Sequence, residues 1–257
     1  CCNIGSVLSD QKKYPEAIQY FNKALNINPE GTIYFSLGNI YKAKDELRKA
    51  AKFYAKAIDF TSDNSEAWNN KGFIYFELGQ AEKAVKCFRK AIQIDPNDNN
   101  FHNNLGLAYS TLREYKYAVL AHKRALQLTP NCVQTLKKLG YALERSGDLL
   151  GSIRSFQKAI NINHEDTEAA IKFRYLKDQV CDWSKSQELI SSISEFGVGE
   201  DRVEPFFMYS MEDHPERQLI RASKYVLEKY NEEPIPLPDK PKSKPGKLRI
   251  GYFSADF

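Results

Sequence analysis

A spacing of 34 residues recurs through most of this chain and limits what it can fold into. Aligned glycines mark it: the steps from 38 to 72, from 72 to 106 and from 106 to 140 are each 34 residues. Two consecutive units repeat seven positions in register: Trp68, Gly72, Tyr75, Ala84, Phe88, Ala91 and Pro96, then His102, Gly106, Tyr109, Ala118, His122, Ala125 and Pro130. Such a period predicts an array of stacked units, each contacting its neighbours, in place of one globular core.

This pattern resembles the tetratricopeptide repeat, in which each unit is a pair of antiparallel helices. The small residues fall where two helices would cross closely, and Tyr or Phe would fill the space beside them. Gly79 and Gly147 fall between paired helices, where a left-handed cap is expected. We therefore expect an all-α, right-handed solenoid over residues 1–166, with an incomplete first repeat and a capping helix over 167–180.

Polar residues just before the repeat glycines are the candidate binding residues, because the first helix of each pair lines the concave face in this repeat type. Seven of them are predicted to bind an acceptor polypeptide: Asn3, Asn69, Asn70, Asn103, Asn104, Lys137 and Lys138. A column of carboxamides can both donate to and accept from the backbone of an extended peptide, whatever its sequence. The two lysines would favour an acidic segment. The alternative, that these asparagines are only tolerated on an exposed helix face, stays open.

Composition narrows the choice of partner and compartment. The net charge is +4, from 37 basic and 33 acidic residues, which favours solvated helix faces over a nucleic-acid surface. The apolar runs are too short to span a bilayer. The five cysteines lack metal-ligand spacing, so we expect reduced thiols, no metal and a cytoplasmic or nuclear location.

The period stops after Val180. Residues 181–231, which open with Cys-Asp-Trp and later contain Pro-Glu-Arg-Gln-Leu, are expected to form a helical transition region. Residues 232–247 are rich in proline and lysine and predict a stiff linker. Residues 248–257 read Leu-Arg-Ile-Gly-Tyr-Phe-Ser-Ala-Asp-Phe, which is typical of the first buried strand of an α/β domain.

The succession of repeats, Cys-Asp-Trp, proline linker and final apolar strand resembles the protein O-linked N-acetylglucosamine transferases and their Spindly-type relatives, glycosyltransferase family 41. The resemblance implies that residues 248–257 begin a GT-B type domain, and that the repeats present acceptor proteins to it. Asn3, Asn70 and Asn104 match the asparagine ladder of that family, whereas Ser36 and Lys138 depart from it.

What the resemblance implies for chemistry is transfer of N-acetylglucosamine from UDP-GlcNAc to Ser or Thr, with no metal and with the catalytic histidine beyond Phe257. These residues alone would then lack catalytic and cofactor-binding groups and be inactive. Two alternatives remain: a Spindly-type fucosyltransferase that uses GDP-fucose, and a non-enzymatic adaptor that only binds proteins. Self-association through the repeats is a further expectation.

Overall fold

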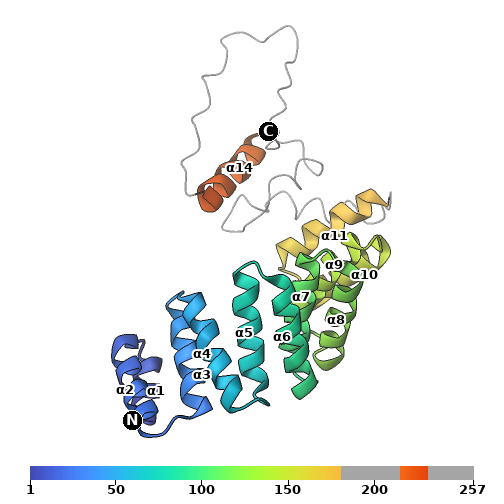
Figure 1. Ribbon diagram of the computed structural model, residues 1–257. Helices are drawn as coiled ribbons and strands as arrows, with labels where there is room; N and C mark the ends of the chain where they lie inside the picture. The colour runs from blue at the N-terminus through green and yellow to red at the C-terminus, as the bar shows by residue number, and fades with distance from the viewer. Residues whose placement is uncertain (181–214, 231–257) are drawn as a thin grey trace, which may run out of the picture. The chain divides into compact units, whose positions relative to one another are not determined.

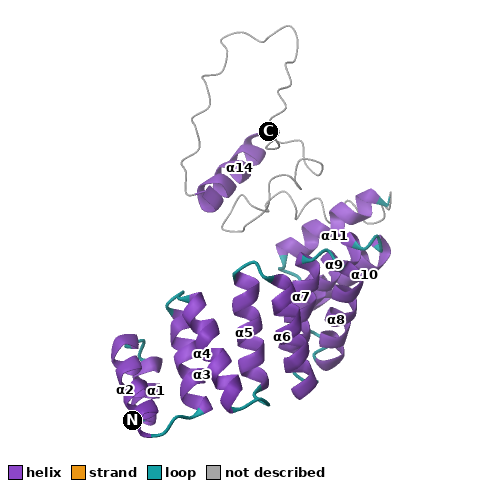
Figure 2. Cartoon of the chain, in the orientation of Figure 1, coloured by secondary structure: helices purple, strands orange, loops and turns teal. Residues whose placement is uncertain are grey.

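The computed structural model describes residues 1–180 and 215–230 of the chain. The chain divides into two units, residues 1–193 and 194–257. The described residues contain helices and turns and no strand (Figure 2). The linker expected over 232–247 and the strand expected over 248–257 lie outside them, as does most of the transition region.

Five helical hairpins and one further helix form the described part of the first unit (Figure 1). The helices are α1 (Cys2–Asp10) and α2 (Tyr14–Ile27), α3 (Gly31–Ala43) and α4 (Leu47–Phe60), α5 (Ser65–Glu77) and α6 (Ala81–Ile94), α7 (Asn99–Thr111) and α8 (Tyr115–Leu128), α9 (Val133–Arg145) and α10 (Leu149–Ile162), and α11 (Thr167–Gln179). In the second unit, α14 (Pro215–Tyr230) begins with a proline, which is favoured at the first helical position.

Each hairpin closes where a ring from the second helix packs against the repeat glycine of the first. A Cβ added to Gly38 would lie 2.7 Å from the Tyr54 ring, and one added to Gly106 would lie 2.5 Å from the ring of His122. Atoms cannot approach this closely, so a larger residue would push the two helices apart. The period seen in the sequence is therefore the period of these crossings.

The turn inside each hairpin contains one residue in the left-handed region. Gly79 and Gly147 have φ of 71° and 91°, as the sequence predicts. The same place in the other hairpins holds Lys12, Asp45 and Arg113, each with φ of 60°. A side chain there costs free energy that glycine avoids. The turn therefore recurs in every hairpin, although glycine marks it in the sequence of only two of them.

The first helices of the hairpins line one face of the array. Contacts between neighbouring hairpins join the first helices α1 to α3, α5 to α7 and α7 to α9. Within residues 1–180, the second helices of neighbouring hairpins do not contact one another to the same degree. The residues that precede the repeat glycines therefore follow one another along the face formed by α1, α3, α5, α7 and α9, which we call the inner face. Among the described helices, none combines the length and the apolar character that crossing a bilayer requires.

Candidate functional site

Two amide pairs on the inner face connect successive repeats. The Asn104 side chain on α7 donates from Nδ2 to Asn69 Oδ1 on α5 over 2.9 Å. Asn70, also on α5, donates from Nδ2 to Asn39 Oδ1 on α3 over 3.4 Å. The four half-buried residues Asn39, Asn69, Asn70 and Asn104 are called the amide row below.

The amide row has hydrogen-bonding capacity beyond these pairs. A carboxamide offers two N–H donors and a carbonyl that accepts two bonds. Within residues 1–180, Asn104 Oδ1 and Asn69 Nδ2 make no side-chain hydrogen bond, while the opposite ends of both groups hold each other in place. The row can therefore donate to and accept from a ligand while its side chains are already ordered.

Asn39 belongs to this row although the repeat pattern in the sequence does not mark it. It directly follows Gly38, so it lies one turn beyond Phe35 and Ser36 on the same side of α3. Its Oδ1 also accepts a 2.7 Å hydrogen bond from the Tyr54 hydroxyl. Burial raises the pKa of Tyr54 above its ordinary range, so the hydroxyl keeps its proton and remains a donor. Helical spacing around position 36 was the signal that could have identified Asn39.

Asn103 points into the array and leaves the predicted column. It is only 9 % exposed. Its Nδ2 donates to Thr135 Oγ1 over 2.8 Å, and its Oδ1 lies 3.2 Å from Nδ1 of His122. With Oδ1 as an acceptor, the proton of the neutral His122 ring lies on Nδ1. Burial, with a smaller contribution from Lys138, lowers the pKa of His122 to about 4.

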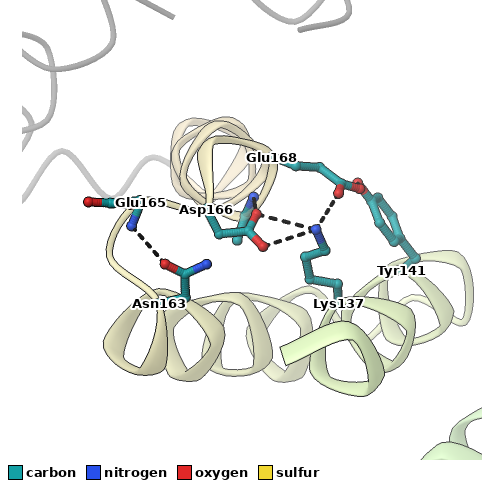
Figure 3. A network of polar contacts seen from close by, with 7 residues as sticks. Lys137, Tyr141, Asn163, Glu165, Asp166 and Glu168 are labelled. Atoms are coloured by element: carbon teal, nitrogen blue, oxygen red, sulfur yellow. Dashed lines mark hydrogen bonds and ion pairs between the residues drawn. The ribbon is translucent and has the colours of Figure 1, made fainter. Parts of the chain in front are cut away.

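Lys137 is also committed to its own chain. Its Nζ lies 3.0 Å from Asp166 Oδ2 and pairs with Glu168, which in turn accepts a 2.8 Å hydrogen bond from the Tyr141 hydroxyl (Figure 3). Burial alone would lower the pKa of Lys137, but the Glu168 and Asp166 carboxylates outweigh it and raise that pKa. Asp166 also caps α11 by accepting from the backbone N–H of Ala169 over 2.8 Å. This cluster therefore attaches α11 to α9, and the positive charge of Lys137 is already compensated by two carboxylates.

The remaining predicted residues differ in exposure. Asn3 is exposed on α1, and Lys138 is half-buried on α9. Neither makes a side-chain hydrogen bond or ion pair in the described residues. The structure thus brings Asn69, Asn70 and Asn104 together with Asn39, and turns Asn103 and Lys137 inward.

Aromatic side chains adjoin the amide row. Phe73, 37 % exposed, follows Gly72 on α5 as Asn39 follows Gly38 on α3. Phe35 and Phe76 are half-buried on the same two helices, and Phe35 packs its ring against Tyr54 at a centroid distance of 5.8 Å. The inner face can thus contact apolar side chains as well as backbone polar groups.

Within the described residues, no group of three His, Cys, Asp or Glu side chains could hold a metal ion. Cys1, Cys2, Cys87 and Cys132 are free thiols.

Family models agree with this architecture. A model described as TPR repeat matches residues 38–79 and 72–112, and one described as Tetratricopeptide repeat matches residues 1–30. These matches identify tetratricopeptide repeats over residues 1–30 and 38–112, and the hairpins that follow, up to Ile162, continue the same helical architecture.

Known proteins share parts of this repeat array. BBSome complex member BBS4 of Bos taurus is 32 % identical over 78 residues, which are 30 % of this chain and 15 % of that protein. General transcriptional corepressor ssn6 of Schizosaccharomyces pombe is 29 % identical over 75 residues, or 28 % of this chain and 7 % of that protein. The matched segments are thus small parts of these relatives.

Solved structures share the fold at low identity. YrrB, described as a TPR protein with an unusual peptide-binding site, has a TM-score of 0.61 at 22 % identity and covers 68 % of this chain and 91 % of its own. PilF of Pseudomonas aeruginosa has a TM-score of 0.64 at 17 % identity, covering 86 % and 95 %. MamA has 0.60 at 20 % identity, covering 64 % and 97 %. These likenesses support the repeat fold and do not bear on the resemblance to glycosyltransferases.

Proposed function

We propose that the tetratricopeptide-repeat array is a protein-interaction module that holds an extended polypeptide segment against α3, α5 and α7. The amide row is the observation that carries this proposal. Asn104 Oδ1 and Asn69 Nδ2 leave an acceptor and a donor open on the inner face, and these match the N–H and C=O groups of an extended backbone.

The pairs between repeats strengthen this interpretation. Asn104 with Asn69, and Asn70 with Asn39, each restrain two side chains before a ligand arrives. Less side-chain freedom is then lost on binding, which improves affinity. The exposed ring of Phe73 adds an apolar contact that could select particular side chains of the partner.

The test compares Asn70→Ala/Asn104→Ala with the unmodified protein. Peptides selected from a random display library on the unmodified protein serve as probes, and dissociation constants are measured by fluorescence anisotropy. Losing two backbone-directed amides should weaken binding about 30-fold, since each hydrogen bond contributes about 1 kcal/mol and about 1.4 kcal/mol corresponds to tenfold in affinity. The control, Asn22→Ala/Asn26→Ala, removes two exposed amides from α2. Unchanged affinity, or equal losses in both variants, would refute the proposal.

A second candidate function is that of the acceptor-binding part of a protein O-glycosyltransferase. It rests on residues 181–183 and 248–257, whose sequences resemble family 41 and which lie outside the described residues. In this proposal the donor is UDP-GlcNAc, with GDP-fucose as the variant, and the inner face delivers the acceptor polypeptide.

Incubating the full-length protein with radiolabelled UDP-GlcNAc or GDP-fucose and acceptor proteins separates the two candidates. Label transferred to Ser or Thr supports the enzyme and identifies its donor. If peptides bind but no sugar is transferred from either donor, only the proposal of an interaction module is supported.

A further inference from the structure

A hollow of about 380 Å³ lies between the fourth and fifth hairpins. It is lined by Ser110 at the end of α7, Arg113 in the turn, Tyr115 at the start of α8, and Tyr141, Ala142 and Arg145 on α9. Tyr141 follows Gly140 as Asn39 follows Gly38, so it shares the register of the inner face, while Arg113 and Tyr115 place the hollow at the turn-side edge of that face.

Two arginines contribute positive charge to the lining of the hollow. Arg113 and Arg145 are both exposed, and in the described residues neither pairs with a carboxylate. Of the acidic groups close to the hollow, Glu144 pairs with Lys172 over 2.9 Å, and Glu168 shares Lys137 with Asp166. Glu114, between Arg113 and Tyr115 in the sequence, is exposed and makes no ion pair within residues 1–180. An anion that enters the hollow would thus meet two unpaired guanidinium groups.

The polar groups of the hollow favour an acceptor-rich ligand. Each guanidinium presents five N–H donors in a planar fork. Ser110 donates its own hydroxyl to the Gly106 carbonyl over 3.0 Å, and Tyr141 donates to Glu168. The donors left for a ligand are therefore mainly those of the arginines, and they carry two positive charges together.

We propose that this hollow binds the phosphoryl group of a phosphorylated serine or threonine on the polypeptide that lies along the inner face. A phosphate monoester carries nearly two negative charges at neutral pH and three acceptor oxygens, which match two guanidinium groups better than one carboxylate does. The inference rests on the proposed polypeptide-binding function and adds a specificity to it.

The test uses immobilised pools of short peptides that are degenerate except at one central position, which holds phosphoserine, serine or glutamate. Binding of the full chain to each pool is measured by biolayer interferometry at low and physiological salt. We expect the phosphoserine pool to bind about tenfold more tightly than the serine pool, as charge-assisted hydrogen bonds allow. Arg113→Gln/Arg145→Gln should remove most of this preference.

A matched control variant, Arg89→Gln/Arg154→Gln, makes the same charge change at exposed arginines on α6 and α10 and should keep the preference. Equal binding of the phosphoserine and serine pools overturns the inference and leaves the polypeptide-binding function standing. The inference is also overturned if the glutamate pool binds as tightly as the phosphoserine pool, or if both arginine variants lose the preference for phosphoserine equally. Failure of all three pools to bind overturns the polypeptide-binding function as well.

Discussion

The buried imidazole of His122 predicts that the array loses stability as the pH falls. Its second-helix position is occupied by Tyr54, Phe88 and Phe156 in other repeats, and the ring is 1 % exposed. Its pKa is lowered from 6.5 to about 4. Between these two pH values, the unfolded chain binds a proton that the folded chain excludes, so the free energy of unfolding decreases as the pH falls through this window.

The size of the effect follows from the shift. One pKa unit corresponds to about 1.4 kcal/mol, so lowering the pH from about 7.5 to about 4.5 should remove about 2–3 kcal/mol through His122. In His122→Phe, this contribution disappears. Asn103 then loses a hydrogen-bond partner, which costs about 1 kcal/mol at any pH. The variant should therefore be less stable than the unmodified protein near pH 7.5 and more stable near pH 4.5.

Urea denaturation followed by circular dichroism, repeated across this pH range, measures the pH at which the variant becomes more stable than the unmodified protein. The comparison between variant and unmodified protein cancels groups that both share. His164→Asn, which replaces an exposed histidine, controls for the loss of one titrating side chain. Stability curves of His122→Phe and the unmodified protein that stay parallel from pH 7.5 to 4.5 would refute this account of the buried ring.

Two other predictions concern local stability. Lys137→Met should leave Asp166 and Glu168 without their cation and destabilise the attachment of α11 by about 3 kcal/mol. The loss should appear as faster amide hydrogen exchange in α11. Exchange rates equal to those of the unmodified protein would contradict this prediction. Because the pKa of Lys137 is raised, this stabilisation is present below pH 10.5 and is lost as the pH rises through the raised value. Asp45→Gly should stabilise the array by about 0.5–1 kcal/mol, since Asp45 has φ of 60° where Gly79 and Gly147 avoid the cost; a lower urea midpoint would contradict it.

The helical array could be predicted from the sequence because its determinants are local. Gly38 and Tyr54, like Gly106 and His122, are 16 residues apart and lie on the two helices of one hairpin. Repetition of this pair therefore reveals both the crossing and the period. Gly79 and Gly147 mark their turns for the same reason, whereas Lys12, Asp45 and Arg113 adopt the same backbone without a sequence signal.

The partners of the inner-face side chains could not be predicted in this way. Asn103 turns inward because two buried partners bind its side chain there. The Thr135 hydroxyl, 32 residues away, accepts from its Nδ2, and the His122 ring donates to its Oδ1. Lys137 is neutralised by Asp166, 29 residues away on the far side of a hairpin. Neither separation is a feature of the repeat, so the sequence pattern treats Asn103 and Lys137 as equivalent to Asn69, which stands at the same distance before its repeat glycine.

The sequence alone thus determined the repeat, its hairpins and the helix positions that form the inner face, because a 34-residue spacing encodes contacts within one hairpin. Only the tertiary structure decided which of those positions remain available to a ligand. That choice depends on competition between neighbouring hairpins for the same polar groups, and the neighbours meet only when the hairpins stack. Asn39 and the hollow between Arg113 and Arg145 likewise became apparent only there.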